Sequence, residues 1–110
     1  MWNLTPQQEA LQQKARELAT EVIAPRAAEI DRTEQYPWDN VATLQEAGFT
    51  GMTVPQELGG LGHSFLDAVL VIEEMAKHCG VTGRIAVEAN MGAISAVLAY
   101  GTESQRKMAA

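Results

Sequence analysis

The sequence predicts an all-α fold, a bundle of about five to six helices. Most of the chain carries apolar residues at spacings of three, four and seven, the pattern of a helix with one buried face. Three segments also begin with a capping box, in which a Ser or Thr and the third residue after it bond to each other's backbone. Only residues 51–54 resemble a strand, and Pro55 interrupts them.

The first capping box and a proline define two helices near the N-terminus. Thr5 can cap a helix whose first turn holds Pro6, and the Gln8 side chain can bond back to the cap. Pro25 has no amide hydrogen and disfavours helix at the preceding residue, so we expect the helix to end or kink there. A shorter helix at about 26–32 follows. The apolar stripe of the first helix consists of Leu4, Leu11, Ala15, Leu18 and Val22.

A short helix and an irregular loop are predicted in the middle of the chain. Asp39 or Asn40 can start the helix and Gly48 can close it. Residues 48–62 are rich in glycine, which predicts an ordered, tightly turning loop. Its Gly59-Gly60-Leu61-Gly62 run lacks the strand and the spacing of a dinucleotide-binding loop, so we interpret these glycines as structural.

Two longer helices follow the loop. Ser64 and Asp67 form the second capping box. The helix that they open is expected to carry one apolar side, made of Phe65, Ala68, Val69, Ile72, Met75 and Ala76. Gly80 and Gly83 are expected to separate it from a helix at about 84–100, which is apolar nearly all round and should be buried in the middle of the bundle.

The chain of 110 residues is predicted to form one domain, 1–110. The third capping box, Thr102 with Gln105, starts a last helix that would be marginal alone, so we expect more chain to follow it. The 8 Lys and Arg residues against 14 Asp and Glu residues give a formal net charge of −6. Nucleic acid and anionic membrane surfaces are therefore poor partners.

The cytoplasm is the expected location. Cys79 is the one cysteine, so no internal disulfide indicates an oxidising compartment. The segment Met1 to Thr5 has no basic region followed by a long apolar run, so no signal peptide is expected. The longest uncharged stretch, 89–102, is too short and too polar to span a bilayer.

No motif in the chain carries a reaction by itself, and we predict no catalytic residue and no metal site. His63 and His78 are not at metal-ligand spacing with other ligands. Cys79 is interpreted as a small packed side chain. Glu73 and Glu74 point in different directions on a helix, and one of them is expected to pair structurally.

Arg84 and Glu88 lie four residues apart at the start of the apolar helix, hence on one face. A charge on a buried helix needs a partner, because burying it alone is costly. One interpretation is that the two residues pair with each other. The other is that Arg84 binds an anionic group of a ligand, for which Gly92 and Ser95 leave room.

Several segments, taken in order, resemble the N-terminal domain of the acyl-CoA dehydrogenases over essentially the whole chain. They are Leu4 to Gln8, the kinking Pro25, Leu44 with Ala47 to Phe49, Val54 to Gly62, Val71 to Ala76, and Tyr100 to Gln105. The resemblance implies a helical front domain followed by a β-barrel-like middle domain and a C-terminal four-helix bundle, usually in a homotetramer. It also implies FAD between domains, a glutamate that removes the α-proton of a short-chain acyl-CoA thioester, and hydride transfer from the β-carbon to the flavin.

The flavin contacts and the catalytic base of that family belong to domains outside these residues, so the chain alone is not expected to be active. The resemblance implies that the central helix borders the acyl cavity, with residues 54–62 near the thioester. The substrate-binding residues would be Arg84, Glu88, Met91, Gly92 and Ser95.

The stretch Thr33 to Val41 and Arg84 are similar to a side branch, the 3-sulfinopropanoyl-CoA desulfinases, which keep the fold and FAD but remove sulfite from an anionic substrate. Two alternatives to an enzyme domain stay open. One is a non-catalytic helical binding module, and the other is the ordered part of a longer, cleaved protein.

Overall fold

The computed structural model describes residues 3–110, and within them the chain forms seven α-helices and no strand. The helices are α1 (Pro6–Leu18), α2 (Ala24–Thr33), α3 (Trp38–Ala47), α4 (Phe65–His78), α5 (Gly80–Met91), α6 (Ala93–Tyr100) and α7 (Glu103–Ala109). The predicted all-α fold is therefore confirmed. The signal-peptide prediction rests partly on Met1 and Trp2, which lie outside the described residues.

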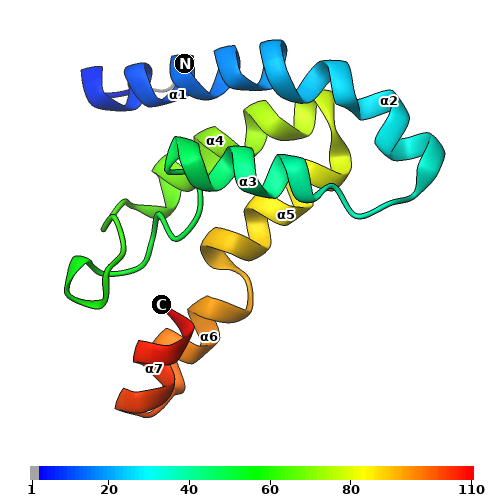
Figure 1. Ribbon diagram of the computed structural model, residues 1–110. Helices are drawn as coiled ribbons and strands as arrows, with labels where there is room; N and C mark the ends of the chain where they lie inside the picture. The colour runs from blue at the N-terminus through cyan, green and yellow to red at the C-terminus, as the bar shows by residue number, and fades with distance from the viewer. Residues whose placement is uncertain (1–2) are drawn as a thin grey trace.

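Helix α4 lies at the centre of the packing, against α1 on one side and α5 on the other. The buried core comes from α1, the turn after it, α3, the following loop, α4 and α5. It is made of Ala15, Ala19, Ile23, Leu44, Phe49, Met52, Ala68, Val71, Met75, Cys79 and Ala86. Helices α6 and α7 lie at one end of the molecule, beyond the α4–α5 pair (Figure 1). No helix among the described residues is long and apolar enough to cross a membrane.

The N-terminal helices form one kinked rod, as the position of Pro25 predicts. The Thr5 capping box is present, with the Gln8 amide donating to Thr5 Oγ1 at 3.1 Å. A π-helical turn, Ala19–Ile23, joins α1 to α2, and Pro25 lies in the first turn of α2. Because Pro25 has no amide hydrogen to bond back along the rod, the chain bends at this position without ending (Figure 1).

Helix α3 begins at Trp38, earlier than predicted, and Asn40 does not cap it. Asn40 is instead fully buried, where its Nδ2 donates to Thr82 Oγ1 at 2.8 Å and its Oδ1 accepts from Arg26 Nη1 at 3.0 Å. These bonds connect α2, α3 and α5. Gly48 closes α3 in a left-handed conformation, with φ of 79°, as predicted.

The loop after α3 turns tightly and contains one short 3-10 helix, Gln56–Leu58, and no strand at 51–54. The backbone of Gly60 lies against Val54, where an added Cβ would stand 2.2 Å from the Val54 carbonyl oxygen. The interpretation of this glycine as structural is confirmed, because the contact excludes any side chain.

The apolar side predicted for α4 is partly wrong. The capping box of Ser64 and Asp67 starts the helix as expected. The buried side chains, however, are Ala68, Leu70, Val71, Glu74 and Met75. Phe65 is 60% exposed and Val69 is 43% exposed. The helix has two apolar stripes, and packing between α1 and α5 buries only one of them.

The prediction for residues 80–100 also needs correction. Gly80 and Gly83 lie within α5, which follows α4 through the buried Cys79. Gly83 allows α5 to approach α4, since an added Cβ would stand 2.8 Å from Ala76 Cβ. The single helix expected at 84–100 is divided at Gly92, and α6 has no buried residue in the described chain, so the expected burial is wrong for α6. The capping box of α7 is confirmed.

Glu74 is the buried acidic residue of α4, with 1% exposure, and it pairs structurally as expected of one of the two adjacent glutamates. Its Oε1 accepts from Arg16 Nη2 at 3.1 Å and from Lys77 Nζ at 3.0 Å. Burial raises the pKa of the Glu74 carboxyl, but the bonds from Arg16 and Lys77 outweigh burial and hold the pKa below its ordinary value of 4.5.

A lowered folded-state pKa means that Glu74 stabilises the fold above about pH 4.5 and that this contribution is lost as the pH falls through the folded-state value. We expect Glu74→Gln to lower the free energy of unfolding by about 1–3 kcal/mol at pH 7. The difference in the free energy of unfolding between Glu74→Gln and the wild type should be smaller at pH 3. Urea unfolding at both pH values measures this, with the exposed neighbour Glu73→Gln as the control. An equal loss at both pH values would contradict the assignment.

Candidate functional site

The two charged residues predicted to bind substrate lie on the solvent side of α5. Arg84 Nη2 is 2.9 Å from Glu88 Oε1, and Arg84 Nε donates to the same oxygen at 3.0 Å. The side chains are 76% and 47% exposed, so the expectation that these charges are buried is wrong for the described chain. The interpretation in which they pair with each other is confirmed. Because both remain exposed, the Arg84 guanidinium is also available to an anion from solution.

The structure brings four of the five predicted substrate-binding residues together at the α5–α6 junction. The Glu88 carboxylate lies over Gly92, where an added Cβ would stand 2.0 Å from Glu88 Oε2. The Ser95 amide donates to the Gly92 carbonyl at 3.0 Å across the break. Met91, the fifth residue, ends α5 and is half-buried. The junction therefore places the Arg84–Glu88 ion pair next to Gly92 and Ser95, while Met91 packs against the hydrophobic core.

The loop predicted near the thioester shares a cavity with this junction. The cavity has a volume of about 390 Å³ and is lined by Val54, Gly59 and Gly60 from the loop and by Ala89 and Ile94 from the two sides of the break. Ala109 and Ala110 at the end of the chain also line it, whereas none of the five predicted substrate-binding residues does. This arrangement places loop backbone next to the end of α5.

Asn90 is the residue that the sequence interpretation missed. It is fully buried in α5, where its Nδ2 donates to the carbonyls of Phe49 and Ala86, both at 2.9 Å. Its Oδ1 accepts from the Met52 amide at 2.8 Å. An asparagine within an otherwise apolar helix was the available signal, because a buried amide requires several hydrogen-bond partners.

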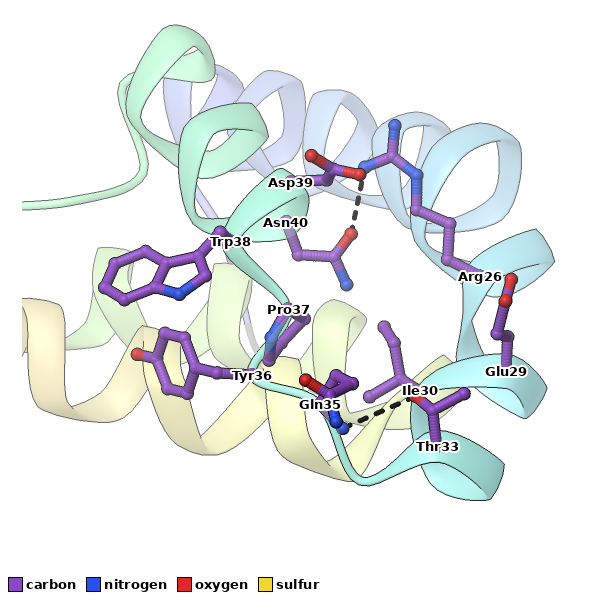
Figure 2. A pocket seen from close by; sticks show the side chains of 10 residues that line it. All are labelled: Arg26, Glu29, Ile30, Thr33, Gln35, Tyr36, Pro37, Trp38, Asp39 and Asn40. Carbon is purple, nitrogen blue, oxygen red and sulfur yellow. Dashed lines mark hydrogen bonds between the residues drawn. The ribbon is translucent and has the colours of Figure 1, made fainter.

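A larger cavity, of about 560 Å³, lies between α2 and the segment before α3. Figure 2 shows Arg26 on one side of it and the rings of Tyr36 and Trp38 turned away from Arg26. The ring centroids are 4.6 Å apart. Glu29 and Asp39 also line the cavity. The desulfinase-like stretch at 33–41 therefore forms one wall of this cavity rather than part of the α5–α6 junction.

His63 and Asp67 form another polar site, at the N-terminus of α4. His63 Nδ1 lies 3.0 Å from Asp67 Oδ2, and Gln8 Nε2 donates to Asp67 Oδ1 at 3.0 Å. Burial raises the pKa of the Asp67 carboxyl, but bonds from Gln8, His63 and Ser64 lower it below the ordinary value. The cluster connects α1 to α4. No group of three metal-ligating side chains occurs anywhere in residues 3–110.

Comparison with known proteins assigns the fold to a family. The family model for the acyl-CoA dehydrogenase N-terminal domain matches residues 5–109. The chain therefore belongs to the acyl-CoA dehydrogenase family, as an N-terminal domain.

The relatives within this family include desulfinases. The 3-sulfinopropanoyl-CoA desulfinase of Variovorax paradoxus is 59% identical over all of this chain, which covers 28% of that protein. The short-chain specific acyl-CoA dehydrogenase of Clostridium acetobutylicum is 38% identical over 96% of the chain, again covering 28% of the relative. The chain thus spans little more than a quarter of the length of these relatives.

A solved structure has the same fold. It comes from work on the electron transferring flavoprotein of Acidaminococcus fermentans and matches 98% of this chain with a TM-score of 0.89 and 30% identity. The chain covers 28% of that structure.

Proposed function

We propose that this chain is the N-terminal domain of an FAD-containing enzyme that removes sulfite from 3-sulfinopropanoyl-CoA. The observation that carries the proposal is the difference in identity within one family. A desulfinase is 59% identical to the chain, whereas a short-chain acyl-CoA dehydrogenase is 38% identical over nearly the same residues. The chain then supplies part of the acyl pocket, and the rest of the protein supplies the catalytic groups.

FAD belongs, in this proposal, to the complete enzyme. Its diphosphate carries negative charge and requires basic side chains or free backbone amides. The cavity of about 560 Å³ sets Glu29 and Asp39 beside Arg26, and Arg26 already donates to Asn40 and Thr43. The residues of this cavity therefore do not fit a diphosphate, and we assign the flavin contacts to the remainder of the protein.

The α5–α6 junction provides groups suited to a small anionic acyl chain. A sulfinate, like a carboxylate, accepts charge-assisted hydrogen bonds from a guanidinium, a role that suits Arg84. Glu88 keeps Arg84 in place through their ion pair. The Met91 thioether suits contact with the acyl carbons. The absence of a side chain at Gly92 gives the Glu88 carboxylate its place over the junction, next to Ser95 in the sequence of the break.

Assembly and location follow from the same proposal. We place the enzyme in the cytoplasm as a homotetramer, with the acyl-CoA thioester and the other domains as partners of this chain. Exposed apolar side chains on α4 and at the end of α6, including Phe65, Val69 and Tyr100, offer surface for such packing.

Desulfination and dehydrogenation differ in their electron balance. Sulfite release breaks the carbon–sulfur bond, and water supplies a proton to the carbon and a hydroxyl to the sulfur, so propanoyl-CoA and hydrogen sulfite form without net oxidation. Dehydrogenation removes two electrons and two protons and requires an acceptor. We expect the whole protein to release sulfite from 3-sulfinopropanoyl-CoA without an added acceptor. Acceptor-dependent oxidation of butanoyl-CoA without sulfite release would assign it to the dehydrogenases instead.

Arg84→Ala tests the role of the junction. We expect affinity for 3-sulfinopropanoyl-CoA to fall about tenfold or more, because a charge-assisted hydrogen bond is lost, while affinity for neutral butanoyl-CoA stays within about twofold. Arg32→Ala is the matched control, since Arg32 is also an exposed helical arginine and lies 3.6 Å from Glu29. Titration of the whole protein with both thioesters measures the effect. Equal affinities before and after the Arg84 change would exclude this role.

A further inference from the structure

The end of α5 is stabilised by a loop far from it in the sequence. The last four carbonyls of a helix have no partner within that helix. In α5, the Ala89 carbonyl accepts from the Gly51 amide at 3.0 Å, and the Asn90 carbonyl accepts from the Thr53 hydroxyl. Two carbonyls at the break thus accept hydrogen bonds from residues 51–53. In most helices, the residues that directly follow the helix donate such bonds.

This support explains why the helix stops although its sequence continues to be apolar. Residues 84–100 have the composition of one continuous helix, and a glycine within a helix costs only about 1 kcal/mol. The break at Gly92, with φ of −78° and ψ of −125°, forgoes helical hydrogen bonds that the loop replaces. Helix α5 therefore ends at Met91, directly after the two carbonyls that the loop bonds.

Within this cap, Thr53 donates its hydrogen bond through the side-chain hydroxyl, whereas Gly51 donates through its backbone amide. Thr53 is half-buried, whereas Met52 beside it is fully buried in the core. Val54 on its other side packs against Gly60. Removing the Thr53 hydroxyl therefore changes the cap while leaving the packing of the loop in place.

We propose that Thr53 is a positioning residue that, through its bond to the Asn90 carbonyl, fixes the α5–α6 break and hence the placement of Met91, Gly92 and Ser95. This proposal rests on the proposed function, in which these three residues border the acyl group. Thr53 itself does not touch the substrate. It acts by holding the end of α5, so its loss alters how well the junction fits an acyl chain.

The test compares Thr53→Val with the wild type in the whole protein. Valine keeps the branched shape and removes the hydroxyl. We expect amide hydrogen exchange at Met52, Asn90 and Met91 to become about tenfold faster, because the cap is weakened. We expect KM for 3-sulfinopropanoyl-CoA to rise several-fold, with kcat within about twofold of the wild type. Thr53→Ser, which restores a hydroxyl, should return both measurements toward the wild-type values.

Thr20→Val is the matched control, since it also removes a hydroxyl that donates to a backbone carbonyl, that of Arg16, and lies outside the loop and the α5–α6 junction. Unchanged exchange at the end of α5 in Thr53→Val would overturn the proposal, and so would faster exchange with an unchanged KM. A wild-type protein that binds butanoyl-CoA but releases no sulfite would refute the proposed function alone. In that case the dissociation constant for butanoyl-CoA is measured in place of KM. Its change between the wild type and Thr53→Val then decides the role of Thr53.

Discussion

Replacing Asn90 with leucine is expected to destabilise the chain by about 3–5 kcal/mol, because two buried backbone groups lose their partner. The Met52 amide and the Phe49 carbonyl both bond the Asn90 side chain at less than 3 Å, and leucine can bond neither. Leucine keeps the branched shape of asparagine and leaves no cavity, but its methyl groups are larger than the amide atoms, so overpacking of the buried site adds to the loss. A domain of this size has a total stability of about 5–15 kcal/mol, so much of it is lost.

Urea unfolding followed by helical circular dichroism measures this effect. Gln45→Leu is the control, since it makes a similar replacement of an amide at an exposed position on α3 and should change stability by at most about 0.5 kcal/mol. A loss below about 1 kcal/mol in Asn90→Leu would mean that the loop and α5 are held together by packing alone.

Gly60→Ala is expected to destabilise the chain by about 3 kcal/mol or more, because its Cβ has no space. The nearest atoms are the carbonyl oxygen of Val54 at 2.2 Å and its Cβ at 2.3 Å. These atoms belong to the backbone and to a buried side chain, so neither can turn aside. The loop must move as a whole, which also strains the cap that residues 51–53 form on α5.

Substitutions at two other glycines, Gly59 and Gly80, separate the steric cause from a conformational one. Gly59 has a φ of +92° and no atom within 4 Å of an added Cβ, so Gly59→Ala should cost only about 1 kcal/mol, from backbone conformation. Gly80 has open space and a helical position, so Gly80→Ala should be neutral or slightly stabilising. The midpoint of thermal unfolding should fall most in Gly60→Ala, less in Gly59→Ala, and not at all in Gly80→Ala. Equal effects at Gly59 and Gly60 would contradict the steric argument.

The features predicted correctly from the sequence depend on residues close together in the chain. Each capping box, such as that of Ser64 and Asp67, involves bonds across three residues, and each was predicted. Pro25 acts through its own missing amide hydrogen, so its kink could also be expected. The same holds for the pairing of Arg84 with Glu88, because residues four apart on a helix are neighbours.

The features that the sequence did not reveal depend on contacts between distant segments. The break at Gly92 depends on bonds from Gly51 and Thr53, and the pairing of Glu74 with Arg16 joins two helices. Which apolar stripe of α4 is buried depends on where α1 and α5 pack. Periodicity within one helix carries no information about these partners. The acyl-binding role of the junction remains a prediction, because it concerns a ligand rather than contacts within the chain.

We propose above that these residues are one domain of a flavin-containing enzyme acting on an acyl-CoA thioester. Intact mass and visible absorption of the protein purified from its source test this claim most directly. We expect a mass several times larger than 11.9 kDa, with the absorption bands of a bound flavin. A mass of 11.9 kDa without visible absorption would contradict it and would instead indicate a helical binding module.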